Sequence, residues 1–266
     1  MDPVLDRLRN IVYQKSGISL GDNKVALLQA RIGKRMRALG LPDCRTYLRY
    51  LTDDESGGEL VQLIDAIATN VTSFFRERVH FELLGEALSG WLDRGQKSFR
   101  FWSAACSTGE EPYSMAIQLF ETLKGVRAEC KILATDISTR VLRTAQAGVY
   151  DRKKLDPVPP SLRRVYFTRT LTDRGEFYTV RPFVKEPILF RRLNLAHFPL
   201  PLSGPFDAIF CRNVMIYFDG TTRSRLFQEI DRLLRPGGYL MVGHAESPVG
   251  IMSNFKTVRA SVYRKQ

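Results

Sequence analysis

A short strand, a loop of small residues and an amphipathic helix follow one another over residues 98–123, and this succession limits the possible folds most. The strand is expected at 98–103 and the helix at 111–123. The loop between them consists mostly of small residues and contains a single glycine, Gly109. Small residues at a turn from strand to helix let a ligand approach the backbone closely. The sequence therefore predicts an α/β fold with a ligand site at this turn.

A second apolar strand, expected at 131–135, leads directly into Asp136. An acidic residue at the end of the second strand accepts hydrogen bonds from ribose hydroxyls in Rossmann-like folds. The alternative interpretation is that Asp136 only caps the helix that follows. Because the loop with Gly109 lacks the G-x-G-x-x-G pattern of dinucleotide binding, a diphosphate cofactor is disfavoured. A nucleoside without phosphate fits the loop better.

Strands and helices continue to alternate along the rest of the chain. Such alternation predicts a mostly parallel, doubly wound sheet. A Pro-Gly-Gly turn at 235–238 is expected to end the last helix, and a final strand at 257–263 is expected to pair with the strand before it. Further strands are expected at 206–211 and 239–244, and further helices at 77–93, 138–147 and 222–234.

The N-terminal part of the chain is expected to be entirely helical. Apolar residues recur at helical spacing up to Gly17, and a second helix is expected from Asp22, a plausible N-cap, to Leu39. Two shorter helices are expected at 43–51 and 58–68. These four helices would form a small bundle.

The pattern divides the chain into a helical domain and an α/β domain. Short strands around 177–180 and 188–190, with a turn near 173–175, break the alternation and indicate a small antiparallel insertion. The expected boundaries are a helical domain at 1–70, a junction at 71–77, a Rossmann-like domain at 78–266 and the insertion at 156–192.

Three long runs carry a resemblance to a known family. They cover residues 70–76 (Asn-Val-Thr-Ser-Phe-Phe-Arg), 103–114, which include the loop with Gly109, and 206–218, which follow a predicted strand. In this order they resemble the chemotaxis-receptor glutamate methyltransferases, the CheR family, and the resemblance extends over nearly the whole chain. It implies a Rossmann-like S-adenosylmethionine-dependent methyltransferase domain after an all-α domain. It also implies transfer of the methyl group to receptor glutamates, which leaves methyl esters and S-adenosylhomocysteine.

The resemblance assigns the cofactor site to residues of the three runs and of two further segments. For several of them a simpler role is also open: Glu111 lies where a helix dipole favours acids, and the alternative for Asn194 is a simple turn residue. Phe74 and Phe75 would be buried anchors that hold the junction over the pocket. The residues implied to bind the cofactor are Asn70, Thr72, Arg76, Ala105, Glu111, Asp136, Asn194, Leu195, Asn213 and Val214.

Catalysis is expected to be a direct displacement at the cofactor methyl group. Because acceptor oxygen, methyl carbon and sulfur must lie in line, catalysis is largely a matter of positioning. A glutamate carboxylate has a pKa of about 4.3 and is already ionised at neutral pH, so that no general base is needed. Arg76 and, through its hydroxyl, Tyr217 are the candidates for orienting the acceptor carboxylate. Arg76 should hold it loosely, because tight binding would also stabilise the ground state.

The chain has a formal net charge of +12, which predicts acidic partners. A basic stripe on the second helix consists of Lys24, Arg31, Lys34 and Arg35. Such a stripe is often only a solvated helix face. The resemblance implies that it docks the acidic cytoplasmic methylation helices of receptors, where charge complementarity would raise the association rate.

Other features of the sequence narrow the partners. The four cysteines and three histidines show no metal-ligand spacing, so no metal is expected. Neither a membrane span nor a signal peptide is recognisable, which predicts a cytoplasmic protein without membrane insertion, and a monomer is the default. In the family, the small β insertion can bind a C-terminal pentapeptide tether of the receptor. The turn at 170–176 has fewer glycines than that binding pattern, and tether binding stays open.

Two other classes of function remain as alternatives. An RNA methyltransferase would agree with the positive charge, but the chain lacks an amino-methylation motif of the N/D-P-P-Y type, a cysteine pair for C5 methylation and aromatic-rich basic runs for stacking on bases. No nucleic-acid partner is therefore expected. A non-catalytic module that senses the cofactor or docks receptors is the second alternative. The presence of Arg76, Asp136, Asn213 and Tyr217 argues against such a loss of activity.

Overall fold

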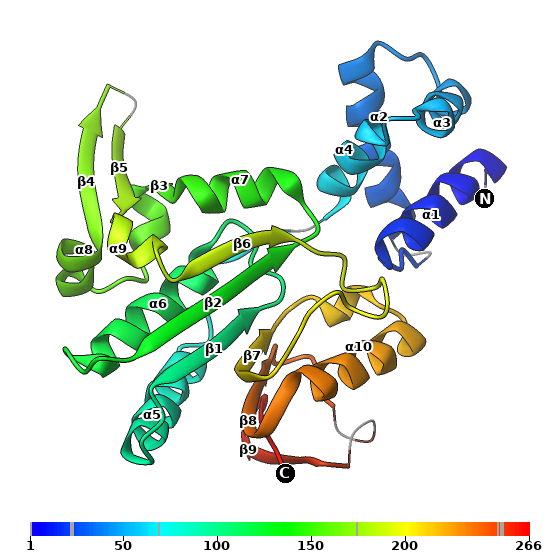
Figure 1. Cartoon of the computed structure of the whole chain (residues 1–266). Helices are drawn as coiled ribbons and strands as arrows, with labels where there is room; N and C mark the ends of the chain where they lie inside the picture. Colours follow the sequence, from blue (N-terminus) through cyan, green and yellow to red (C-terminus); the bar gives the residue numbers. More distant parts are fainter. Residues whose placement is uncertain (1, 22–23, 69, 174, 249, 251–252) are drawn as a thin grey trace.

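The computed structural model describes residues 2–21, 24–68, 70–173, 175–248, 250 and 253–266. It consists of a helical bundle, a large mixed sheet with helices on both faces, and a small antiparallel sheet (Figure 1). The bundle and the small sheet lie apart from each other, on either side of helix α7 (Thr139–Ala147) (Figure 1). None of the described helices is both long and apolar enough to cross a bilayer.

The N-terminal bundle is built from amphipathic helices whose apolar faces share one core. The side chain of Asp2 caps the first helix and that of Asp43 the third, while Gly17 ends the first helix with a φ of 73°. The expected N-cap Asp22 lies outside the described residues. The helices are α1 (Pro3–Ser16), α2 (Val25–Leu39), α3 (Cys44–Asp53) and α4 (Gly58–Ile67), and the core they enclose includes Leu8, Val12, Leu28, Ile32, Tyr47 and Leu63.

The large sheet has the strand order β6-β2-β1-β7-β8-β10-β9. The first five strands of this order run parallel to one another, and the last two are antiparallel additions. The predicted Rossmann-like fold with a mostly parallel sheet is thus confirmed. The strands are β1 (Ser98–Ser103), β2 (Glu129–Asp136), β6 (Ile188–Arg192), β7 (Phe206–Cys211), β8 (Leu234–Val242), β9 (Phe255–Arg259) and β10 (Val262–Lys265).

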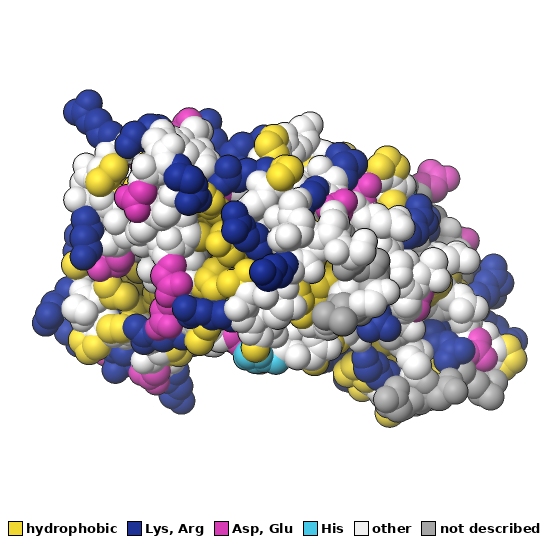
Figure 2. All heavy atoms as spheres, turned by 90° about the horizontal axis from the view of Figure 1, so that it is seen from below, with side chains coloured by type: hydrophobic (Ala, Val, Ile, Leu, Met, Phe, Trp, Pro, Cys, Tyr) yellow, Lys and Arg dark blue, Asp and Glu magenta, His cyan; other side chains and the backbone are white. Residues whose placement is uncertain are grey.

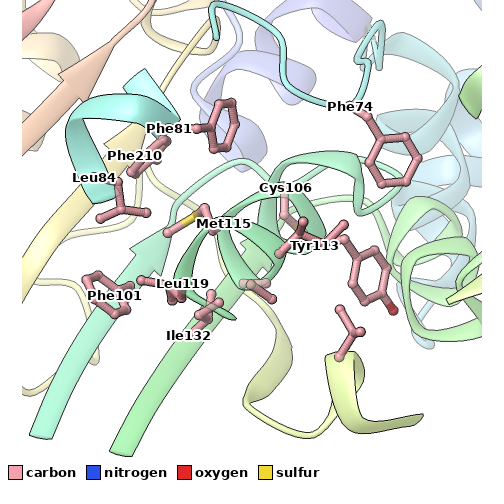
Figure 3. Packing of buried hydrophobic residues seen from close by; sticks show 14 of the residues in the cluster. Phe74, Phe81, Leu84, Phe101, Cys106, Tyr113, Met115, Leu119, Ile132 and Phe210 are labelled. Carbon is pink, nitrogen blue, oxygen red and sulfur yellow. The ribbon is translucent and has the colours of Figure 1, made fainter. Parts of the chain in front are cut away.

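Helices cover the sheet on both faces because alternate strand residues point to opposite sides. On one face, α5 (Val79–Asp93) and α6 (Glu110–Leu123) pack on Phe101 and Ile132. Figure 3 shows this cluster, with Leu119 close to these two side chains and Phe81 close to Phe210 on the neighbouring strand. On the other face, α10 (Gly220–Leu233) packs on Trp102 and Ile209, whose positions alternate with those of the first face.

The small sheet has the order β3-β5-β4 and is antiparallel. One expectation is corrected here: residues 188–192 were placed in this insertion, but β6 pairs in parallel with β2 at the edge of the large sheet. The elements of this region are β3 (Val149–Asp151), η2 (Arg152–Leu155), α8 (Pro160–Tyr166), β4 (Phe167–Thr172), β5 (Gly175–Val180) and α9 (Pro182–Lys185).

Two further expectations about the C-terminal part are corrected. The Pro-Gly-Gly segment at 235–238 is not a separate turn: it lies inside β8, where the register with β7 shifts and Gly237 has a φ of 73°. The single strand expected at 257–263 is two strands, β9 and β10, joined at Ser261 with a φ of 60°. Only β10 pairs with β8, and β9 forms the edge of the sheet.

Hydrogen bonds tie the helical bundle to the carboxyl edge of the large sheet. The side-chain amide of Asn194 donates to the carbonyl oxygen of Lys15 (2.9 Å). The backbone N–H of Ser19 donates to the carbonyl oxygen of Tyr217 (2.8 Å). The bundle is thereby held against the loops that follow β6 and β7.

The turn into α6 predicts a strong requirement for glycine. Gly109 has a φ of 97°, and a Cβ there would lie 2.9 Å from Ala145 Cβ and from Tyr150 Oη. Gly109→Ala should lower the free energy of unfolding by about 2–5 kcal/mol, since left-handed strain of about 1–2 kcal/mol adds to overpacking of about 1–3 kcal/mol. Gly95→Ala is the matched control, because its φ is 86° and no atom lies within 4 Å of the added Cβ. Equal losses in urea unfolding of the two variants would contradict the steric argument.

Candidate functional site

A pocket lies at the carboxyl edge of the large sheet, where strand order reverses between β1 and β7. Open α/β sheets bind ligands at such a switch point. The helical bundle closes the pocket from the other side with residues of α1, α2 and α4 and the segments that follow them. All residues predicted to bind the cofactor line this one pocket, as does Tyr217: Asn70, Thr72, Arg76, Ala105, Glu111, Asp136, Asn194, Leu195, Asn213 and Val214.

Asp136 ends β2 in the wall of this pocket and is 8% exposed. One carboxylate oxygen accepts from the backbone N–H of Ser107 (2.9 Å) and the other from that of Ser138 (3.0 Å). Burial raises the pKa of Asp136, and these backbone hydrogen bonds oppose the rise. The cap of α7 is Ser138 and not Asp136. Each oxygen keeps acceptor capacity toward the pocket, as ribose hydroxyls would require.

The two acidic residues at the start of α6 have different surroundings. Glu110 is fully buried and accepts a hydrogen bond from the Lys154 ammonium (2.8 Å). Glu110 does not line the pocket. Glu111 lines the pocket and accepts from the Ser103 hydroxyl (2.7 Å) and from the Arg212 guanidinium (3.0 Å). Burial raises the pKa of Glu111, and Arg212 opposes this effect. Of the two carboxylates, only Glu111 is placed to meet a cationic group in the pocket.

Arg212, directly after β7, connects three segments of the pocket wall. Its guanidinium forms ion pairs with Glu77 (3.1 Å) and Glu111 (3.0 Å) and donates to the carbonyl oxygen of Arg76. The rings of Phe81 and Phe210 lie 5.6 and 5.9 Å from it. Sequence reasoning gave Arg212 no role. The signal that could have found it is a charged residue that directly follows a buried strand inside a matched run.

The junction is held over the pocket by its aromatic residues. Phe74 is 1% exposed and packs edge-on against Tyr150, with ring centroids 5.0 Å apart. Figure 3 shows Phe74 on the same side of the cluster as Tyr113. Phe75 is half-buried against Phe81 (5.5 Å), and its N–H donates to the Ser114 hydroxyl (2.9 Å). The structure therefore gives both phenylalanines the expected anchoring contacts.

Two polar side chains of the junction face the pocket with donor capacity to spare. The amide nitrogen of Asn70 is buried in the wall and has no hydrogen-bond partner among the described residues. Arg76 donates to the carbonyl oxygen of Val71 (3.0 Å), and no carboxylate of the described chain pairs with its guanidinium. Buried donors without partners are costly, so that an acceptor group of a ligand is the expected complement.

The loop after β7 places Asn213, Val214 and Tyr217 on the pocket wall. Asn213 has a φ of 57°, which is uncommon for a residue other than glycine. Tyr217 ends a short 3₁₀ turn (Met215–Tyr217), and the Lys24 ammonium lies 5.2 Å from its ring centroid. The candidate acceptor side of the pocket thus lies where the bundle meets this loop.

Asn194 and Leu195 follow β6 and also line the pocket. The side chain of Asn194 is engaged within the chain, since it accepts from the N–H of Ala196 (3.0 Å) and donates to Lys15. Leu195 is buried beside other apolar residues of the sheet. The contacts of Asn194 agree with the simpler turn interpretation and leave its second acceptor position for a ligand.

The basic stripe on α2 does not form one continuous open face. Arg35 binds Glu59 through two hydrogen bonds (2.9 and 2.6 Å), and Glu59 also accepts from the Tyr47 hydroxyl. Arg35 is thus already paired with a residue of α4, and its part in docking stays a prediction. Lys34 is exposed, Arg31 is half-buried and Lys24 lines the pocket. Figure 2 shows that Lys and Arg side chains are spread over the whole of one face.

The residues of the pocket fit S-adenosylmethionine. Asp136 ends the second strand as a ribose partner would, Glu111 could hold an ammonium group, and the unpartnered amide of Asn70 could donate to a carboxylate or a base. Among the described residues, no group of three or more His, Cys, Asp or Glu could hold a metal ion.

The strand order, the crevice at its switch point and the acidic end of β2 define a Rossmann-like enzyme that binds a nucleoside-type cofactor. Two family models match this chain: "CheR methyltransferase, SAM binding domain" over residues 70–264 and "CheR methyltransferase, all-alpha domain" over residues 3–68. The chain therefore belongs to the CheR methyltransferase family. It is an S-adenosylmethionine-dependent methyltransferase.

Curated relatives agree with this assignment over nearly their full length. The chain is 40% identical to chemotaxis protein methyltransferase 2 of Pseudomonas aeruginosa, over 97% of this chain and 91% of that protein. It is 39% identical to the chemotaxis protein methyltransferase of Escherichia coli, over 97% and 88% of the two chains. The corresponding protein of Borreliella burgdorferi is 36% identical, over 98% and 93%.

Acid should destabilise this protein through His80, which is 1% exposed next to Glu77 and Arg212. Burial, together with Arg212, lowers the pKa of His80 to about 4. In the unfolded chain this histidine binds a proton with a pKa of about 6.5. The contribution of neutral His80 to the free energy of unfolding is therefore complete above pH 6.5 and is lost as the pH falls from 6.5 towards 4. Between pH 7.5 and 5 the wild type should lose about 2 kcal/mol more than His80→Gln. Chemical unfolding at both pH values measures this, with exposed His197→Gln as control, and equal losses would contradict it.

Proposed function

We propose that this chain transfers the methyl group of S-adenosylmethionine to glutamate side chains of bacterial chemotaxis receptors, in the cytoplasm. The products are glutamate methyl esters and S-adenosylhomocysteine, and each transfer removes one negative charge from the receptor and so adjusts its signalling. The observation that carries the proposal is the single pocket that joins Asp136 and Glu111 to Arg76 and Tyr217. It combines groups suited to the cofactor with groups suited to an anionic acceptor.

The cofactor, when bound, supplies an electrophilic methyl group on a sulfonium. Asp136 would accept hydrogen bonds from the ribose, and Glu111 would hold the methionine ammonium. Asn70 and Thr72 would close over the cofactor from the junction, while Ala105 leaves room for it beside the loop after β1. The opposite wall, around the adenine, would be formed by Asn194, Leu195, Asn213 and Val214.

The acceptor carboxylate would be oriented by Arg76 and Tyr217. Arg76 keeps free donor positions because the one hydrogen bond that its guanidinium makes within the described chain goes to the backbone carbonyl of Val71. Arg212 is less suited to this role, since both terminal nitrogens of its guanidinium already pair with Glu77 and Glu111. One or two hydrogen bonds from Arg76 and Tyr217 would align the carboxylate without a proton transfer, because the acceptor is ionised at neutral pH.

The receptor helices would dock on the outer side of the bundle and reach the pocket past Lys24. Arg31 and Lys34 are the remaining cations of the stripe for this contact, because Arg35 is engaged by Glu59. We propose that residues 1–70 act as this docking domain and residues 78–266 as the catalytic domain, in a monomer. A receptor tether, where one exists, would add to β4, the exposed edge of the small sheet.

Loss of the carboxylate at the end of β2 should weaken cofactor binding. In Asp136→Asn, a charged acceptor for the ribose hydroxyls is lost, which should weaken S-adenosylhomocysteine binding by about 2 kcal/mol, or roughly 30-fold. Isothermal titration calorimetry of the purified chain measures the change. Asp151→Asn, which alters a helix cap of the small sheet region, should bind like the wild type. Unaltered binding by a folded Asp136→Asn would remove this residue from the site.

Arg76→Ala should separate binding from turnover. The variant should still bind S-adenosylhomocysteine, whereas methylation of a receptor should fall by about 100- to 1,000-fold, as for the loss of a well-placed electrostatic donor. Base-labile methyl ester on a receptor fragment is the readout. Arg78→Ala, an exposed neighbour paired with Glu82, should keep its turnover. Full activity of Arg76→Ala would contradict the proposal that Arg76 orients the acceptor.

A further inference from the structure

The carboxylate of Glu246 lies buried behind the loop that carries the candidate acceptor residues. Glu246 follows β8 and is 7% exposed. One oxygen accepts from the backbone N–H groups of Gly243 (2.7 Å) and Asn213 (2.8 Å). The other accepts from those of Met215 (2.7 Å) and Ile216 (3.3 Å). This single carboxylate therefore satisfies four backbone donors, three of which belong to the loop after β7.

No cation neutralises Glu246 within the described chain: no Lys, Arg or His there lies within ion-pair distance of it. Its stabilisation comes from oriented backbone dipoles, as in other anion sites made of successive N–H groups. A neutral side chain could not replace it, because four donors need two acceptor oxygens with free lone pairs. The geometry thus requires an acid at this position and not merely a polar residue.

The loop that Glu246 holds has an unusual backbone. Asn213 adopts a φ of 57°, a conformation that persists when surrounding contacts enforce it. Gly243 packs directly against it: a Cβ on Gly243 would lie 2.5 Å from Asn213 Nδ2 and 2.8 Å from the Glu246 carboxylate. Close approach of backbone, carboxylate and Asn213 is therefore possible only because residue 243 is a glycine.

The same loop continues into the pocket. The N–H of Tyr217 donates to the carbonyl oxygen of Val214 (3.1 Å), which closes the short turn next to the residues held by Glu246. Asn213, Val214 and Tyr217 line the pocket, whereas Glu246 does not. Glu246 can therefore act on the reaction only through the placement of these three side chains.

We propose that Glu246 is a positioning residue for methyl transfer: its buried carboxylate fixes the loop 213–217 so that Asn213 faces the cofactor and Tyr217 the acceptor. The statement about the acceptor rests on the proposed function, while the statement about Asn213 concerns cofactor binding alone. Glu246 touches neither ligand itself.

The test is Glu246→Gln, compared with Glu186→Gln, an exposed carboxylate at the end of α9. The amide group of the glutamine would point a donor at two backbone donors and displace the loop. We expect S-adenosylhomocysteine to bind about fivefold more weakly and kcat to fall more than tenfold, with KM for the receptor changed less. Glu186→Gln should match the wild type in all three.

A double-mutant cycle distinguishes positioning from general destabilisation. If Glu246 acts through Tyr217, the loss of kcat in Glu246→Gln should shrink to less than threefold in a Tyr217→Phe background, because coupled residues are not additive. Equal losses in both backgrounds, or an unchanged S-adenosylhomocysteine affinity, would overturn the proposal. Should Glu246→Gln fail to fold, Glu246→Asp keeps the charge but not the reach, and the same cycle is run with it.

The two parts of the experiment separate this proposal from the proposed function. Calorimetry with S-adenosylhomocysteine needs no receptor, so it tests the effect of Glu246 on the cofactor wall by itself. If the wild-type chain bound S-adenosylhomocysteine but methylated no receptor, the proposed acceptor would be refuted. The calorimetric comparison of Glu246→Gln with the wild type would still decide whether Glu246 positions the cofactor wall.

Discussion

The pocket depends on one buried guanidinium. Arg212 joins the end of β7, the start of α6 through Glu111, and the junction through Glu77 and the backbone of Arg76. These segments come from distant parts of the chain, and Arg212 links them by charge in addition to the aromatic packing and the hydrogen bond of Phe75 to Ser114. Removing a partner from such a buried arrangement leaves an uncompensated charge, which costs about 3–5 kcal/mol. Arg212 therefore helps to hold the Glu111 carboxylate and the backbone of Arg76 in place.

Two further carboxylates support the loops at the same edge of the sheet. Asp136 accepts backbone N–H groups from the loop after β1 and from its own turn, and Glu246 accepts them from the loop after β7. Loops that leave a parallel sheet expose unpaired backbone donors, and buried acids satisfy them. Supports of this kind make the loops rigid, which positions a ligand more accurately than flexible loops do.

The sequence predicted the elements whose signal is local. Periodicity located most helices and the central strands, and the family resemblance predicted residues that line the pocket. The prediction for β6 was wrong, because a five-residue edge strand has the same sequence pattern in a small insertion as in a large sheet. Arg35 was also treated as a surface cation, since its partner Glu59 lies on another helix. Arg212 and Glu246 were missed for the same reason: their partners are defined by the fold and not by spacing.

The balance of charge in the wall supports the proposal that Arg76 meets the acceptor. The carboxylates of Glu77 and Glu111 carry two negative charges and Arg212 one positive charge, so the buried group has an excess of one negative charge. Burial raises the pKa of Glu111, and the charge of Arg212 opposes the rise. An ammonium group next to Glu111 would complete the balance. Because the network is then neutral without Arg76, we propose that its guanidinium is left to meet an incoming carboxylate.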